Sequence, residues 1–185
     1  MKLLFFFLFF LNYDVKIVDV PKAIEYHTKM ADFYYHKGNY PEMLYHLTRK
    51  IHYDKNDVST WSDLSYYYWS MSVDDKIRRE EFKSKAIKYL LEGLEFNKNT
   101  AYLWDEIGRY YINTKEFDTA TKYFLEAIKR KDCQDVTYHF LALCFYKNND
   151  LNKAIDTMES CVKRFPRDEK AKANLKKYKN LLSGS

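Results

Sequence analysis

Two consecutive stretches of the chain place the same kinds of residue at the same spacing. The first, residues 101–134, has aromatic, aliphatic and small residues at Trp104, Ile107, Gly108, Tyr111, Phe117, Ala120, Phe124 and Ala127. The second, residues 135–168, fills the matching positions with Tyr138, Leu141, Ala142, Phe145, Leu151, Ala154, Met158 and Cys161. A 34-residue period with small residues recurring where two helices cross is typical of helix pairs stacked into a solenoid. Such an array predicts a chain that holds a partner.

The first half of the chain carries the same pattern less regularly, in units near 24–57 and 58–100. We expect a helix from Pro21 to Lys37, a left-handed stop at Gly38 and a helix cap at Asn39. Trp61 and Trp104 are 43 residues apart, nine more than the period, and the surplus falls at residues 71–81. We expect it to lengthen the second helix of that unit at its start, with Asp74 or Asp75 as the cap.

The C-terminal end is basic and amphipathic. After Pro166 an apolar stripe at Ala171, Leu175, Tyr178 and Leu182 predicts a final helix over about 167–182, and residues 169–182 would cap the array. Residues 163–179 hold eight Lys or Arg and two acids, although the whole chain is only +5. This end is either a solvated outer face or a contact for anionic lipid or nucleic acid. One tyrosine among the lysines disfavours reading of nucleic-acid bases, so lipid is the better of the two.

The N-terminus resembles an export signal. Met1 and Lys2 precede an unbroken apolar run from Leu3 to Leu11, which is too short to span a bilayer of about 30 Å. Residues 1–20 are therefore expected to form a signal-like segment and short leader before a repeat domain over 21–182. The predicted location is exported or membrane-associated through this segment. The alternative is a cytoplasmic protein whose apolar N-terminus packs on the array.

Little in the sequence points to catalysis, a cofactor or a metal. The four glycines form no phosphate-binding loop, and no two of the five histidines have the i, i+4 spacing of a zinc site. Cys144 and Cys161 fall on apolar helix faces and are expected to be buried, whereas Cys133 falls in a loop where it could be exposed. The prediction is a non-enzymatic chain without cofactor or metal and with no small-molecule substrate.

The repeat residues resemble the tetratricopeptide repeat family over residues 24–182. The resemblance implies an all-α solenoid of about four helix pairs plus a capping helix, wound as a right-handed superhelix. It also implies that the first helix of each pair lines a concave groove in which peptides or partner proteins bind. The signature is specific for a fold and weak for a function.

The register of the resemblance assigns the groove. The predicted groove residues are Asp32, Tyr35, His36, Ser62, Asp63, Tyr66, Trp69, Tyr102, Asp105, Glu106, Arg109, Asn113, His139, Leu143, Tyr146 and Lys147. Aromatic rings beside carboxylates suit a peptide with apolar and basic side chains, with Trp69 and Tyr102 as the anchors. Members that clamp a partner's terminal carboxylate use Lys, Asn and Arg, but acids occupy three of the five matching positions here, namely Asp32, Asp63 and Glu106. The alternatives are that some rings only fill the superhelix, or that a larger complex fills the groove permanently.

Overall fold

The computed structural model describes residues 19–184, and within that range the chain forms nine helices and no strand. The described chain falls into two compact units, residues 19–54 and residues 55–184. The first contains α2 (Val20–His36) and α3 (Tyr40–Tyr53). The second contains α4 (Val58–Asp74), α5 (Arg79–Phe96), α6 (Ala101–Asn113), α7 (Phe117–Ile128), α8 (Asp135–Lys147), α9 (Leu151–Arg164) and α10 (Glu169–Ser183). The signal-like run predicted at residues 3–11 lies outside the described residues.

The 19–54 unit is a helix hairpin whose ends are set by local chemistry. The Asp19 side chain accepts a hydrogen bond from the Lys22 backbone N–H, and Pro21 occupies the first turn of α2. Gly38 adopts φ +67°, the left-handed conformation that a side chain disfavours. The Asn39 side chain then accepts from a backbone N–H at the start of α3. The stop at Gly38 and the cap at Asn39, both predicted from the sequence, are confirmed.

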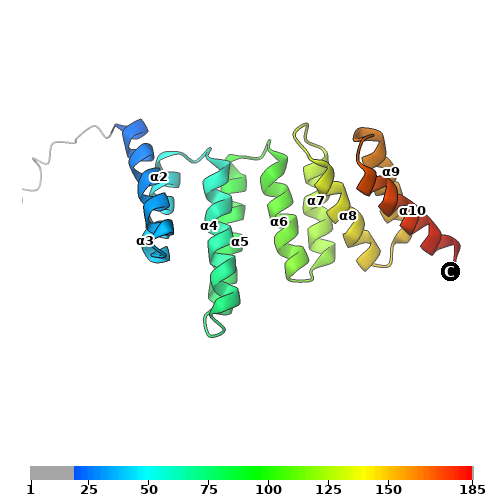
Figure 1. Ribbon diagram of the computed structural model, residues 1–185, viewed down its shortest axis with the longest axis horizontal. Helices are drawn as coiled ribbons and strands as arrows, with labels where there is room; N and C mark the ends of the chain where they lie inside the picture. Colours follow the sequence, from blue (N-terminus) through cyan, green and yellow to red (C-terminus); the bar gives the residue numbers. More distant parts are fainter. Residues whose placement is uncertain (1–18, 185) are drawn as a thin grey trace, which may run out of the picture. The chain divides into compact units, whose positions relative to one another are not determined.

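In the 55–184 unit, helix hairpins follow one another in chain order, α4–α5, α6–α7 and α8–α9, before the single helix α10 (Figure 1). Each hairpin packs on the next, and α6 also lies against α4 and α8. This is the all-α helical-hairpin solenoid that the repeat predicts. No helix among residues 19–184 has both the length and the apolar character that crossing a membrane requires.

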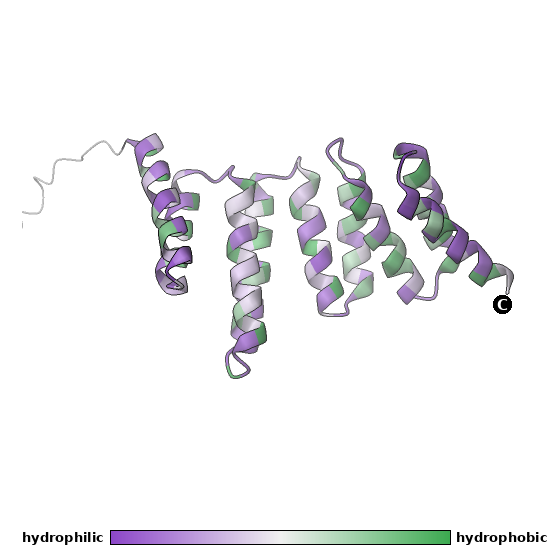
Figure 2. Cartoon of the chain, viewed as in Figure 1, coloured by the Kyte–Doolittle hydropathy of each residue, from purple (hydrophilic) through white to green (hydrophobic). Residues whose placement is uncertain are grey.

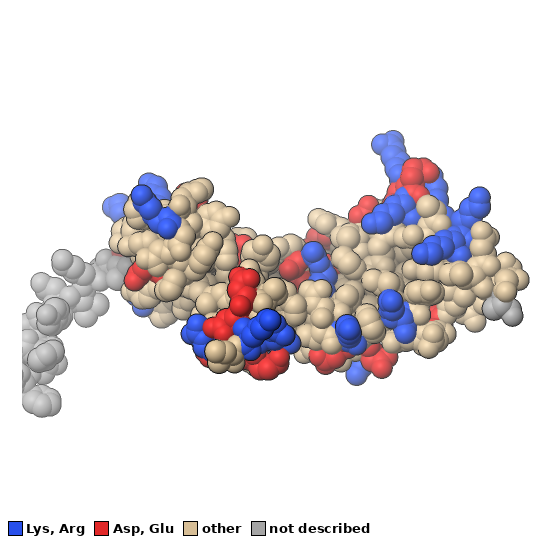
Figure 3. Space-filling view, turned by 60° about the horizontal axis from the view of Figure 1, so that its bottom comes forward, with Lys and Arg blue, Asp and Glu red and all other residues tan. Residues whose placement is uncertain are grey.

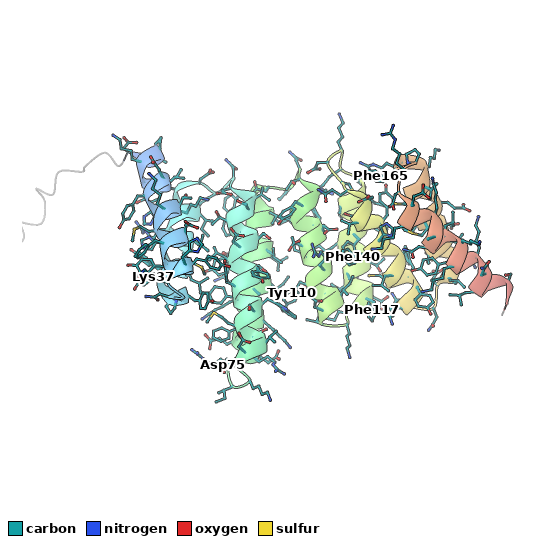
Figure 4. All side chains as sticks on the ribbon, in the orientation of Figure 1. Lys37, Asp75, Tyr110, Phe117, Phe140 and Phe165 are labelled. Atoms are coloured by element: carbon teal, nitrogen blue, oxygen red, sulfur yellow. The ribbon has the colours of Figure 1, made fainter. Side chains whose placement is uncertain are left out.

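The α4–α5 hairpin is longer than its neighbours, but not in the way the sequence suggests. α4 has 17 residues and α5 has 18, against 13 in α6 and 12 in α7. The surplus therefore extends both helices, and the expectation of a lengthened second helix alone is wrong. The reason is Asp75, whose Oδ1 accepts from the backbone N–H groups of Ile77 and Arg78. That side chain builds a tight turn at the hairpin tip, so α4 continues up to it (Figure 4).

Small residues let the paired helices approach closely. A Cβ atom on Gly108 of α6 would lie 2.7 Å from the ring of Phe124 on α7, and one on Gly93 of α5 would lie 2.6 Å from the ring of Trp61 on α4. Ala120 is fully buried in the same region. These contacts give the physical reason for the small residues in the repeat, since a larger side chain would overlap a buried ring.

The α4–α5 hairpin is closed at its entrance by side chains that hold one carbonyl. The Lys55 carbonyl, just before α4, accepts from the Trp61 indole N–H at 3.0 Å and from the Asn97 amide at 2.9 Å. Trp61 belongs to the first helix of the pair, whereas Asn97 ends the second. We call this arrangement a clasp, because it ties the beginning of a hairpin to its end.

The next hairpin repeats the clasp with different residues. The Lys98 carbonyl accepts from the Trp104 indole N–H at 3.1 Å and from Arg130 Nε at 2.9 Å. The Arg130 guanidinium also lies over the Trp104 ring, 4.3 Å from its centre. At the end of α9, Arg164 Nη2 donates a hydrogen bond to the Arg130 carbonyl at 2.8 Å. This bond links α9 to the loop before α8. Each clasp holds the start of a hairpin against the end of the same hairpin.

The C-terminal core explains how α10 ends the array. Ala171 and Tyr178 are buried against α8 and α9, whereas most other side chains of α10 are hydrophilic (Figure 2). Cys144 and Cys161 are fully buried, as predicted. Cys133 is also buried, with 5% of its surface exposed, so the expectation that its loop position exposes it is wrong. The Cys133 side chain packs into the same core as Tyr178.

Candidate functional site: two adjoining pockets along α6

The larger of two neighbouring pockets lies between α4, α5 and α6. It has a volume of about 260 Å³ and is lined by Ser65, Tyr66, Trp69, Leu90, Glu106, Arg109, Tyr110 and Asn113. We call it the aromatic pocket. Five of these residues, Tyr66, Trp69, Glu106, Arg109 and Asn113, are groove residues predicted from the sequence. Tyr110 and Leu90 were missed: Leu90 belongs to a second helix, which the register does not assign to the groove, and Tyr110 lies on α6 but was not among the residues that the register assigns to the groove.

Aromatic rings form one wall of the aromatic pocket. The Trp69 ring meets the Tyr110 ring edge to face, with 5.2 Å between their centres. The hydroxyl of Tyr110, which is labelled in Figure 4, donates to the Lys83 carbonyl at 3.1 Å. Burial raises the pKa of Tyr110 to about 12. Tyr66 is 65% exposed, which agrees with the expectation that the run of four rings at residues 66–69 cannot be buried entirely. The pocket thus combines a fixed ring pair with an exposed one.

The second pocket is smaller and acidic. Its volume is about 70 Å³, and its lining is Ala101, Tyr102, Asp105, Glu106, Arg109, Asp132, Gln134, Val136 and Thr137. We call it the acidic pocket. Glu106 and Arg109 line both pockets, so the two adjoin along the same face of α6. Arg109 Nη1 lies 2.9 Å from Glu106 Oε1 and 4.0 Å from Asp105 Oδ2.

Asp105 has an unusual environment within the acidic pocket. Its residue surface is 7% exposed, and among the residues described Oδ1 is the buried side-chain oxygen that has no hydrogen-bond partner. Burial raises the pKa of the Asp105 carboxyl, although a hydrogen bond with Thr137 and the charge of Arg109 act in the opposite direction. Burial also raises the pKa of Glu106. A buried acceptor without a hydrogen bond destabilises the fold. A ligand donor that bonds to it therefore contributes more binding free energy than the same donor at an exposed carboxylate.

The predicted anchor Tyr102 lies at the mouth of the acidic pocket. It is 46% exposed, and its hydroxyl is 3.2 Å from Ser62 Oγ on α4. The other acid of this pocket, Asp132, is already engaged, since it accepts from the Ala101 N–H and the Thr100 hydroxyl at the start of α6. Asp132 therefore positions α6, which leaves Asp105 and Glu106 as the acids that face the pocket.

Two predicted groove residues on α8, His139 and Tyr146, are in contact with α10 or with the residue just before it. His139 Nε2 is 2.8 Å from Asp168 Oδ2, and His139 Nδ1 is 3.1 Å from the Asn174 amide. Only 11% of the His139 side chain is exposed, so the prediction of His139 as an open groove residue is wrong. Tyr146 stacks on Tyr178 with 5.6 Å between ring centres, but remains 39% exposed. The sequence register places these residues on the correct helix without indicating that α10 covers that face.

The remaining predicted residues, Ser62, Leu143 and Lys147 among them, lie outside both pockets. Asp63 is exposed on α4. Asp32, Tyr35 and His36 belong to the 19–54 unit, where all three are exposed on α2 and Asp32 Oδ1 lies 3.4 Å from His36 Nε2. That these residues form part of a binding surface stays a prediction.

The 19–54 unit also contains a buried histidine pair. His27 Nδ1 on α2 lies 2.8 Å from His46 Nδ1 on α3, and tyrosine rings stack on both imidazoles, Tyr53 on His27 and Tyr34 on His46. Burial lowers the pKa of both histidines. The repeat register places His27 at the position that Trp104 holds in a later unit, but its pairing with a residue 19 positions away carries no sequence signal.

Basic residues gather at the C-terminal end of the 55–184 unit (Figure 3). Some are paired with acids on the same surface, as in Lys172 with Glu169 at 2.7 Å and Lys179 with Glu159 at 2.7 Å. These pairs are exposed, which fits the solvated face considered from the sequence and contributes little stability.

Comparison with known proteins identifies the repeats. The tetratricopeptide repeat family matches residues 101–132 and again residues 141–168. Human protein O-mannosyl-transferase TMTC3 is 32% identical over 101 residues, which make up 55% of this chain. The chain spans only 11% of the length of that protein.

Solved structures of similar fold cover most of the chain. The MamA protein has a TM-score of 0.64 and 17% identity, covering 85% of this chain and 81% of its own. The thermophilic protein TTC0263 of Thermus thermophilus has a TM-score of 0.62 and 17% identity, and the match covers 80% of this chain and 77% of that protein. The second repeat domain of human RPAP3, solved with the HSP70 peptide SGPTIEEVD, has a TM-score of 0.50 and 16% identity, covering 66% and 98%. The chain therefore contains two tetratricopeptide repeats, at residues 101–132 and 141–168, within a helical-hairpin fold that it shares with these solved structures.

Proposed function

We propose that the chain binds an extended segment of a partner protein along α6, with an apolar side chain in the aromatic pocket and a basic side chain in the acidic pocket. The observation that carries the proposal is the pair of adjoining pockets that share Glu106 and Arg109. One offers a half-buried indole and an exposed phenol, and the other offers a buried carboxylate with an unused oxygen. Binding, not catalysis, is the task these groups suit.

The chemistry of the acidic pocket favours a lysine. Its volume of about 70 Å³ suits a compact ammonium group better than the broad fork of a guanidinium. An ammonium carries three donors, so it can reach Asp105 Oδ1 and still bond Glu106. A donor that satisfies Asp105 removes a desolvation cost of about 1–3 kcal/mol. Arg109 would then keep its bond to Glu106 and limit the total negative charge.

A related domain gives a useful contrast. The RPAP3 repeat domains were solved with peptides ending in EEVD, which are acidic. In this chain the acidic pocket carries Asp105 and Glu106, so charge there favours basic segments and opposes acidic ones. We therefore expect a peptide ending in EEVD to bind this chain poorly.

Binding of labelled short peptides, measured by fluorescence anisotropy, tests the proposal. The probes pair one aromatic residue with one lysine at varied separations, and a matched set replaces lysine by glutamate. We expect the lysine set to bind, and Trp69→Ala or Tyr102→Ala to weaken binding by about thirtyfold, or about 2 kcal/mol. Asp105→Asn should weaken the lysine set and spare peptides in which lysine is replaced by leucine.

The matched control is Tyr40→Ala, because Tyr40 is 46% exposed like Tyr102 and lines neither pocket. Circular dichroism of every variant checks that the helices are retained. Equal binding of the lysine and glutamate sets would contradict the charge assignment. Binding that survives both ring deletions would contradict the groove itself.

A second candidate surface rests on the basic end in Figure 3. If α10 contacts anionic lipid, sedimentation with phosphatidylserine vesicles should fall when Lys172, Lys176 and Lys177 are replaced together by Ala, and should fall with added salt. Export or tethering through residues 3–11 is a separate proposal. Fractionation of the full chain against one beginning at Asp14 tests it, and an identical distribution would contradict it.

A further inference from the structure

Three metal-ligating side chains meet where α8, α9 and α10 come together. His139 is on α8, Cys161 is on α9, and Asp168 immediately precedes α10. One ligand atom from each lies within 4.8 Å of the other two. All three are largely shielded, with Cys161 fully buried and the side chains of His139 and Asp168 11% and 8% exposed. We infer that this His–Cys–Asp cluster is a binding site for a divalent ion of the zinc type.

The spacing of the donors is close to what a tetrahedral ion requires. His139 Nε2 is 2.8 Å from Asp168 Oδ2, and Cys161 Sγ is 3.7 Å from the same oxygen. Zinc bonds of about 2.0–2.3 Å at tetrahedral angles separate neighbouring ligand atoms by about 3.3–3.8 Å. The imidazole and the carboxylate would therefore separate by about half an ångström as the ion replaces the proton between them. Side-chain rotation alone supplies such a movement.

The neighbours of the cluster hold its ligands in place. His139 Nδ1 is 3.1 Å from the Asn174 amide nitrogen on α10; when an ion binds at Nε2, the ring proton moves to Nδ1 and the Asn174 amide turns over, so that its oxygen accepts from Nδ1–H. Asp168 uses its other oxygen, Oδ1, to accept from the Ala171 N–H at 2.9 Å, so Oδ2 remains directed at His139 and Cys161. Partners that orient the ligands in this way are a regular feature of protein metal sites.

The donor set selects the kind of ion. A thiolate, an imidazole and a carboxylate suit Zn²⁺, whereas Ca²⁺ and Mg²⁺ require oxygen ligands. Binding converts the Cys161 thiol to a thiolate, and its proton passes to solvent. An open cleft of about 440 Å³ is lined in part by Asp135, Phe165 and Asp168, so the cluster borders solvent at Asp168, the side from which a water molecule would come as the fourth ligand.

Sequence spacing could not reveal this cluster. The ligands are separated by 22 and 7 residues, and neither interval belongs to a recognised zinc motif. The histidine and the cysteine each sit at ordinary positions of the last repeat, and the aspartate is an ordinary helix cap. The solenoid brings them together by stacking α10 on the final hairpin. An ion here would join three helices and fasten the capping helix to the array.

Metal titration of the full chain tests the inference. Protein freed of metal with a chelator is titrated with Zn²⁺ by calorimetry and with Co²⁺ by absorption spectroscopy, because a cobalt–thiolate bond gives a charge-transfer band that other ligands do not. We expect one ion per chain and a thiolate band. Cys161→Ser should abolish the band, whereas Cys144→Ser, which alters a thiol that is equally buried but outside the cluster, should leave it unchanged.

Two further variants separate metal binding from folding. Asp168→Asn keeps a side chain that caps α10 but removes the charged ligand, so affinity should fall while the helices remain. Asn174→Ala removes the partner that orients the imidazole and should weaken binding by about tenfold to a hundredfold. The inference is overturned if wild-type protein gives no thiolate band, or if the band persists in Cys161→Ser. In either case the cluster is only a hydrogen-bonded contact between α8 and α10.

Discussion

Replacing Gly108 by alanine measures how tightly α6 and α7 are packed. In an open helix the change stabilises by about 1 kcal/mol, because glycine is the more flexible residue. Here the new Cβ would lie 2.7 Å from the Phe124 ring, and that ring is fully buried. Forcing a methyl group into a packed core costs about 1–3 kcal/mol. We therefore expect Gly108→Ala to lower the free energy of unfolding by up to about 2 kcal/mol.

A double-mutant cycle tests whether the loss of unfolding free energy in Gly108→Ala comes from the Phe124 ring. Phe124→Leu removes the aromatic atoms that the new methyl group would meet, so Gly108→Ala in that background should recover its helical gain. The coupling energy between the two changes should be about 1–3 kcal/mol. Chemical denaturation followed by tryptophan fluorescence reports on the 55–184 unit, since all three tryptophans lie there. Stabilisation of the wild-type background by Gly108→Ala would refute the reasoning, because it would mean that the helices are not in contact at this point.

Two other measurements probe different parts of the chain. Trp61→Ala should lower the free energy of unfolding by about 3–5 kcal/mol, as for other buried aromatic residues. Trp104→Ala should lower it by less, because Trp104 is only half-buried. Equal losses of unfolding free energy in chemical denaturation would contradict this order. The 19–54 unit should lose stability as pH falls below about 6.5, because burial lowers the pKa of His27 and His46 and the unfolded chain takes up protons first. Amide hydrogen exchange of α2 and α3 at several pH values measures this, and unchanged protection in acid would contradict it.

Much of the fold follows from sequence, because its determinants are local. Helix ends at Gly38 and Asn39 depend on the conformation and side chain of one residue each. The small residue at position 108 was predicted from the repeat spacing, whereas its partner one helix away, Phe124, is identified by the structure. The α4–α5 tip was misjudged, since Asp74 and Asp75 are equally good caps and only the bonds made by Asp75 decide where α4 ends.

The sites were harder to predict, because they depend on which residues distant parts of the chain bring together. Trp69 and Glu106 were expected to share a surface, and the structure places both on the aromatic pocket. Asp105 was expected to be a groove carboxylate, but its burial and its unused oxygen arise from the packing of α6 against α8. His139 is the clearest case, since the residue that occupies it, Asp168, lies 29 positions away and belongs to the start of another helix.

The clasps at Lys55 and Lys98 have a consequence for how such chains lengthen. Each clasp is built from the loop before a hairpin, the tryptophan inside it and a residue at or just beyond its end, so one contiguous segment carries all its parts. A gene duplication that copies such a segment delivers a hairpin already able to close on itself. Recombination that adds or removes a whole hairpin therefore requires no new residues to close it.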